Sequence, residues 1–191
     1  ASSSGVDMIC EVPLGRWDVM AMINNPNAQI VEETAARMRH GGFVRAADLF
    51  DARSFSVSPG EARSMDPQQR LLLERGYDAL HHAGRDRASL MNSVTGVFVG
   101  SGMHDFEEVV IHSPSLSRSV YAATGGAISV MSGRLSFVLG LNGACAAYDT
   151  ACSAALVANH AALRALQQDE CTGALMIGIN LMLVPTSGVS F

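Results

Sequence analysis

Residues 144–156 read ACAAYDTACSAAL, and this stretch decides the fold that we expect. Ala144 to Tyr148 is a short apolar run typical of a buried strand, and the following Ala- and Leu-rich residues 153–168 predict a helix. Cys152 lies where the strand ends and the helix begins, a position at which a side chain faces a cavity while backbone N–H groups converge. The N-terminus of a helix carries roughly half a positive charge, which favours a thiolate, and its N–H groups can stabilise an oxyanion.

The small neighbours of Cys152 leave room for an acyl group, although a buried, inert cysteine is the alternative interpretation. None of the six histidines has a convincing catalytic assignment. His160 lies eight residues along the same predicted helix, ~12 Å away, so it cannot be the base for Cys152 and a packing role is favoured. We expect His81 and His82 on a helix face toward solvent or an interface. His104 and His112 flank an acidic stretch that we expect to be a loop, and a metal site at His104-Asp105 has only weak support.

The rest of the chain alternates strands with helices, which predicts an α/β layered sheet buried on both faces. Asp66 and Pro67 are typical of a helix start, and that helix continues to Gly84. We expect a strand over 94–100, a helix over 127–139 and an apolar strand over 174–183. Residues 1–65 carry several turn signals and predict short pieces separated by turns, with no domain boundary.

Composition excludes several function classes. Charged residues make up only 16% of the 191 residues, the formal net charge is −5, and all thirteen basic residues are Arg. Without Lys there is no Schiff-base lysine, no P-loop lysine and no basic tract, so we expect no nucleic-acid partner. The low charge of the whole chain predicts a large partner interface. Residues 120–191 hold only five of the charged side chains, so this part is expected to form the core.

The chain has no predicted membrane span, because its longest apolar stretch, 174–185, is well short of the ~20 residues that a spanning helix needs. Its start has neither the basic nor the apolar region of a signal peptide. The four cysteines form no CxxC pair and no disulfide framework, which favours a reducing intracellular location, the cytoplasm.

Several motifs, in order along the chain, together resemble one family. They are VPLGRWD at 12–18, GGF at 41–43, FD at 50–51, MDPQQRLLLE at 65–74, TGVFVG at 95–100, SGRLSF at 132–137, LGL at 139–141, DTACSAAL at 149–156 and GINLML at 178–183. The set resembles the β-ketoacyl synthase (ketosynthase) domain of modular polyketide synthases. DTACSAAL is similar to the DTACSSSL active-site motif of that family, with Ala154 where Ser is common.

The resemblance implies a thiolase-like fold, in which two related α/β halves form a five-layered αβαβα body that is normally dimeric. It implies decarboxylative Claisen condensation in polyketide or fatty-acid biosynthesis, with Cys152 as the acyl-accepting nucleophile and its backbone N–H in the oxyanion hole. No cofactor is bound directly; substrates arrive on the phosphopantetheine of an acyl carrier protein. The strand at 144–148 would lie at the dimer interface, and Met182 would approach the acyl pocket.

The matched motifs cover only the N-terminal half of the family's domain. The two histidine motifs of its second half, its catalytic lysine and its first strand motif, IAIVGMxxRFPG, do not occur here. We therefore expect residues 1–191 to form a partial ketosynthase domain, embedded in a homodimer or larger assembly, with the missing half supplied in the same polypeptide or by another chain. A non-catalytic ketosynthase-like scaffold is the alternative. A cysteine hydrolase is disfavoured, because no histidine and carboxylate can be placed beside Cys152.

Overall fold

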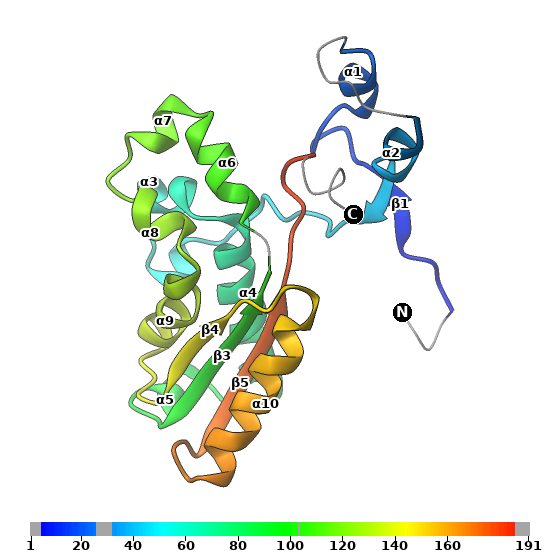
Figure 1. Cartoon of the computed structure of the whole chain (residues 1–191). Coiled ribbons are helices and arrows are strands. Elements are labelled where there is room, and N and C mark those ends of the chain that lie inside the picture. The colour runs from blue at the N-terminus through cyan, green and yellow to red at the C-terminus, as the bar shows by residue number, and fades with distance from the viewer. Residues whose placement is uncertain (1–4, 26–31, 103, 186–191) are drawn as a thin grey trace. The chain divides into compact units, whose positions relative to one another are not determined.

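A computed structural model describes residues 5–25, 32–102 and 104–185 of the chain (Figure 1). The chain divides into two compact units, one made of residues 1–46 with 181–191 and the other of residues 47–180. Within the described part, no helix is both long enough and apolar enough to cross a membrane.

The larger unit is built on a parallel sheet of three strands in the order β4-β3-β5. The central strand β3 (Thr95–Ser101) is buried along its whole length. It pairs with β4 (Cys145–Tyr148) on one side and with β5 (Gly173–Ile179) on the other. A strand that is buried on both faces and paired on both edges needs an unbroken apolar or small-residue sequence, and TGVFVGS supplies it.

Helices cover both faces of this sheet, as Figure 1 shows. On one face, α4 (Pro67–His82) and α9 (Ile128–Leu139) pack so closely that a Cβ added at Gly76 of α4 would lie 2.7 Å from Leu135 and 3.1 Å from Ile177. On the other face lies α10 (Ala154–Gln167), where a Cβ at Gly178 would meet the Ala155 side chain at 2.7 Å. Consecutive residues of β5 thus face opposite layers, as strand geometry requires.

The two faces are filled in different ways. The α4–α9 face holds a large cluster of Leu, Val, Met and Phe side chains that includes Leu73, Val99 and Leu135. The α10 face is thin: Ala158 and Ala162 pack against Phe98 of the central strand. Alanines at this spacing bring the helix backbone close to the sheet, so α10 is held near the strand ends.

Helix α4 begins as the sequence predicts. The Asp66 side chain accepts a hydrogen bond from the Gln68 backbone N–H at 2.7 Å, and Pro67 occupies the first turn. The following Gln69 has a role that the sequence reading did not assign. Its side-chain amide donates to the carbonyls of Thr124 and Ala127, and its Oε1 accepts from Arg134 Nε at 2.8 Å, tying α4 to α9.

Short helices connect these elements: η1 (Arg53–Phe55), α3 (Pro59–Ser64), α5 (Arg87–Leu90), α6 (Asp105–Ile111), α7 (Pro114–Ser117) and α8 (Ala122–Gly126). The prediction of a loop between His104 and His112 is wrong, because α6 occupies it. The acidic residues that suggested a loop stand in the first turn, where they interact favourably with the helix dipole, and Phe106 is buried.

The smaller unit contains an antiparallel pair, β1 (Ile9–Glu11) and β2 (His40–Gly42), with α1 (Val19–Ile23) and α2 (Glu32–Arg37). Three of the sequence motifs meet in it. Trp17 packs edge-to-face on Phe43, with ring centroids 5.7 Å apart. The Arg16 guanidinium donates to the Met182 carbonyl at 3.4 Å, and a Cβ on Gly41 would lie 3.0 Å from the Met182 side chain.

The predicted strands and long helices are confirmed, with one change of extent. The strand expected over 174–183 ends at Ile179, and residues 181–185 belong to the smaller unit. The expectation that residues 1–65 form short pieces between turns is also confirmed within the described ranges.

Candidate active site

Cys152 lies in the short turn that joins the sheet to α10. Strand β4 ends at Tyr148, a 3-10 turn η2 (Ala151–Ser153) follows, and α10 begins at Ala154. Cys152 is exposed and its thiol is free. The alternative of a buried, inert cysteine therefore does not apply to Cys152, whereas it describes Cys171, which is buried.

Two glycines at the end of β3 allow this turn to approach the sheet. A Cβ at Gly100 would lie 2.5 Å from the backbone carbon of Ala154 and the backbone nitrogen of Ala155. A Cβ at Gly102 would lie 3.0 Å from the carbonyl oxygen of Ala151. Only glycine leaves room for backbone at the Gly100 distance, and the contact at Gly102 is tight, so the first turn of α10 is set against the carboxyl end of the central strand.

Hydrogen bonds from neighbouring side chains stabilise the turn. The Ser153 hydroxyl donates to the Thr150 carbonyl at 2.8 Å, and the Asp149 carboxylate accepts from the Ala151 backbone N–H at 3.1 Å. Ala151 has a φ of 53°, in the left-handed region that non-glycine residues rarely adopt. The residue immediately before Cys152 therefore has a disfavoured backbone conformation, and Asp149 is bonded to it.

Helix α10 starts two residues after Cys152. The first N–H groups of a helix have no partner within the helix and carry partial positive charge. A carbonyl oxygen that becomes negative when Sγ attacks its carbon would be stabilised by such groups. The arrangement suits a nucleophilic thiol that forms a tetrahedral, oxyanionic intermediate.

The structure adds a pair that sequence reasoning missed. His104, at the start of α6, has its Nε2 at 3.0 Å from Asp149 Oδ2. This hydrogen bond, followed by the one from Ala151, holds the pKa of Asp149 below its ordinary value. His104 follows β3 and Asp149 follows β4, so the parallel pairing of the two strands was the signal that could have joined them.

The other predicted histidine roles have mixed outcomes. His81 and His82 are exposed at the end of α4, as expected. His160 is exposed on α10 in this chain, on the side of the helix that carries Leu156 and Leu163, so the packing role expected for it stays a prediction. Among the described residues, no group of three or more His, Cys, Asp or Glu side chains could hold a metal ion, and His104 is bonded to Asp149.

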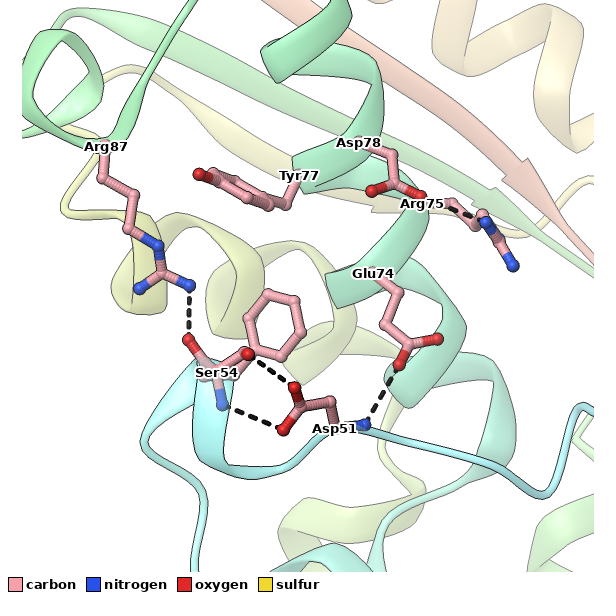
Figure 2. Close-up of a pocket in the computed structure, with 8 residues that line it drawn as sticks. Asp51, Ser54, Glu74, Arg75, Tyr77, Asp78 and Arg87 are labelled. Carbon is pink, nitrogen blue, oxygen red and sulfur yellow. Dashed lines mark hydrogen bonds and ion pairs between the residues drawn. The ribbon is translucent and has the colours of Figure 1, made fainter.

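A separate hollow of about 590 Å³ lies among η1, α4 and α5 (Figure 2). Its lining residues are Asp51, Ser54, Phe55, Glu74, Arg75, Tyr77, Asp78 and Arg87. The Asp51 carboxylate accepts from the hydroxyl and the backbone N–H of Ser54, and Arg87 bonds the Ser54 carbonyl. Each charged side chain drawn there already has a hydrogen-bond or ion-pair partner, so the hollow offers no free charged group to a ligand.

The chain is similar to known proteins over nearly its whole length. The family model described as "Beta-ketoacyl synthase, N-terminal domain" matches residues 3–191. The chain is 45% identical over 188 residues to polyketide synthase GfsB of Streptomyces halstedii, covering 98% of this chain and 3% of that protein. It is 42% identical over 190 residues to the pikromycin polyketide synthase component PikAII of Streptomyces venezuelae, covering 99% of this chain and 5% of that protein.

Solved structures match as well. A ketosynthase from module 6 of the bacillaene synthase of Bacillus subtilis has a TM-score of 0.81 at 29% identity, over 95% of this chain and 28% of that one. An oxazolomycin ketosynthase domain of Streptomyces albus has a TM-score of 0.82 at 29% identity, over 98% of this chain and 32% of that one. The chain thus spans under a third of these solved chains and a few per cent of the two curated relatives.

Proposed function

The chain belongs to the β-ketoacyl synthase family, whose N-terminal domain it matches, and on this premise we propose that it is the acyl-accepting part of a polyketide ketosynthase. The predicted resemblance and the thiolase-like α/β fold are confirmed by the family and by the solved neighbours. One observation carries the proposal: Cys152 is an exposed, free thiol in the turn that begins α10, at the carboxyl edge of a parallel sheet.

The proposed reaction begins with acyl transfer to Cys152. Sγ attacks the carbonyl carbon of an acyl thioester carried on the phosphopantetheine of a carrier protein, and a tetrahedral oxyanion forms. The carbon–sulfur bond to phosphopantetheine then breaks, the leaving thiolate takes the proton that Cys152 gave up, and the acyl group remains on Sγ. The backbone N–H of Cys152 and the first turn of α10 would stabilise the oxyanion.

The second proposed step is condensation. A malonyl-type thioester loses carbon dioxide, and the resulting carbanion attacks the acyl group on Cys152, releasing the thiolate. The negative charge that develops on the malonyl carbonyl requires hydrogen-bond donors, which in the family are histidines of the second half. Residues 1–191 contain neither those histidine motifs nor any lysine, so we propose that the donors come from elsewhere in the assembly.

The outer surface of α10 supports the presence of another layer. The helix buries Ala154, Ala158, Ala162 and Ala165 against the sheet. On its other side Leu156 is 71% exposed and Leu163 is 50% exposed. Large apolar side chains left exposed on the side away from the sheet are typical of an interaction surface, so we propose that α10 is covered by the second half of the αβαβα body.

Strand β4 forms one edge of the described sheet, and its unpaired edge suits the dimer contact that the family implies. We propose a homodimer or larger assembly, with an acyl carrier protein as substrate partner and no cofactor bound to the chain itself. The approach of Met182 to the acyl pocket stays a prediction. The four free cysteines suit the reducing interior of the cell, where we propose that the protein works.

The experiment is acyl loading of the longest natural polypeptide that carries these residues. The protein is incubated with an acyl-pantetheine thioester, and intact mass and peptide mapping locate the adduct. We expect one acyl group on Cys152 and none after Cys152→Ala. Cys145→Ala is the matched control, because Cys145 is also an exposed free thiol. Equal loading of the Cys152→Ala protein would contradict the proposal, and a folded protein with no adduct would favour the non-catalytic scaffold.

A further inference from the structure

We propose that His104 is a positioning residue for Cys152, acting through Asp149. The inference rests on the proposed function of Cys152 and adds a second side chain to the same site. It concerns a histidine that the family's catalytic histidine motifs do not include, because those motifs lie outside this chain.

The geometry is a bridge made by one carboxylate. Asp149 Oδ2 faces His104 Nε2 at 3.0 Å, and Asp149 Oδ1 accepts from the Ala151 N–H at 3.1 Å. A carboxylate only accepts hydrogen bonds, so Nε2 of His104 carries the hydrogen and donates it. The imidazole is thereby connected, through a single side chain, to the peptide unit that precedes the nucleophile.

The bridge ends at Ala151, the residue of this turn that has a disfavoured backbone conformation. Ala151 has a φ of 53°, a conformation that persists in non-glycine residues only where surrounding contacts hold it. The Ala151 N–H bond to Asp149 is one such contact. Fixing the direction of the carboxylate from its other oxygen keeps that bond aligned, so Cys152 is presented in one orientation.

The bridge also joins two strands. His104 begins α6 shortly after β3, and Asp149 directly follows β4, whose Tyr148 pairs with Gly100 of β3. The hydrogen bonds that hold Asp149 keep its pKa below the ordinary value, so the carboxylate stays ionised at neutral pH and both of its bonds persist. Because Nε2 points at Asp149, His104 positions the turn and does not act as the base for Sγ.

The test compares His104→Ala with His104→Gln. Glutamine has a donor N–H at the end of its side chain and no charge, so it can retain the bond to Asp149. The control is His112→Ala, because His112 lies at the other end of α6 and its Nδ1 contacts the Glu108 carbonyl of the same helix. Each variant is made in the longest natural polypeptide, and its thermal unfolding is recorded alongside reactivity.

Two probes are used at neutral pH. Iodoacetamide alkylation, resolved by peptide mapping from the exposed Cys10 and Cys145, measures the Cys152 thiol itself. Loading from an acyl-pantetheine thioester measures the enzymatic step. We expect His104→Ala to slow both at Cys152 by about fivefold to tenfold, as for one lost hydrogen bond between partly exposed groups. His104→Gln should stay within about twofold of the wild type, and His112→Ala should equal it.

The outcomes separate this inference from the proposed function. A His104→Ala protein that reacts as fast as the wild type overturns the positioning role, and so does a His104→Gln protein as slow as His104→Ala. If the wild type is alkylated but never acylated, the proposed function fails, whereas the alkylation rates still decide the role of His104. A fall in unfolding temperature shared by both His104 variants, with only His104→Ala slowed, supports positioning.

Discussion

A Cβ at Gly100 would lie 2.5 Å from the backbone nitrogen of Ala155, closer than any side chain can approach. The end of β3 and the first turn of α10 therefore touch through backbone alone. This contact sets the turn that carries Cys152 against the sheet. It makes Gly100 a requirement of the site although the residue has no chemistry of its own.

Gly100→Ala is expected to displace the first turn of α10. The added methyl group must push backbone, which cannot rotate away, so we expect a loss of about 2–3 kcal/mol in the free energy of unfolding and slower loading of Cys152. Urea unfolding and acyl loading measure the two effects. Gly133→Ala is the matched control, because Gly133 lies in the middle of α9 and a Cβ there would meet nothing within 4 Å. This variant should increase the free energy of unfolding by about 0.5–1 kcal/mol. Equal behaviour of the two variants would show that the close contact is not maintained in solution.

Because Asp66 is buried, we expect the free energy of unfolding to increase as the pH falls below neutral. Burial raises its pKa from 3.8 to about 6, although its hydrogen bonds from Gln68 act in the opposite direction. The folded state therefore binds a proton more tightly than the unfolded state. The penalty for burying the charge is present in full above about pH 6. It is relieved as the pH falls toward 4.

Relative to neutral pH, we expect the free energy of unfolding to increase by about 1 kcal/mol at pH 5, and by at most about 3 kcal/mol at lower pH. Urea unfolding at pH 7.5 and pH 5 measures it. Asp66→Asn keeps an N-cap acceptor for the Gln68 N–H and has no titrating group, so the difference between wild type and variant isolates this residue. A difference that does not change between the two pH values would contradict the assignment.

Gln69→Leu should destabilise the contact between α4 and α9. The side chain is 1% exposed, and its loss leaves Arg134 Nε and the carbonyls of Thr124 and Ala127 without this partner. Buried groups without partners are costly, so we expect a loss of about 3 kcal/mol. Gln168→Leu, at the exposed end of α10, should change the free energy of unfolding by less than about 0.5 kcal/mol. Chemical denaturation measures the free energy of unfolding of both proteins. A loss in Gln69→Leu alone shows that the buried hydrogen bonds of Gln69 matter, and not the removal of an amide as such.

Leu156→Glu tests whether another layer covers α10. The side chain is 71% exposed in this chain. If the second half of the body packs on it, a carboxylate there is buried without a partner. The unfolding temperature of the longest natural polypeptide should then fall by several degrees. Gln168→Glu, at the exposed C-cap of the same helix, should lower it far less, because only the weak repulsion from the helix dipole acts there. An unchanged unfolding temperature for Leu156→Glu would mean that this side of α10 faces solvent.

Much of the fold could be predicted because its signals are local. Asp66 and Pro67 are typical helix-start residues and predict the start of α4. The run of apolar and small residues at 95–101 predicts the buried central strand. The position of Cys152 between a strand and a helix was also predicted from the sequence, and the structure confirms it. The role of Cys152 as the nucleophile stays a prediction. In each case neighbouring residues specify the conformation through caps, periodicity and β-branched content.

The misses come from residues whose surroundings are distant in sequence. The acidic stretch after His104 looked like a loop, and it forms a helix because Phe106 finds a buried position. His104 had no predicted partner, and it meets Asp149 beyond the ends of two paired strands. Neither environment can be predicted from the adjacent residues.

The sequence by itself determined the strands of the larger unit, its long helices, the turn that carries Cys152, and the family. Only the tertiary structure decided that His104 meets Asp149 across 45 positions, and that Gly100 lies against the backbone of Ala155. The physical reason is that caps and hydrophobic periodicity act over a few residues. The parallel pairing of β3 with β4, in contrast, brings together strand ends that are remote in the chain.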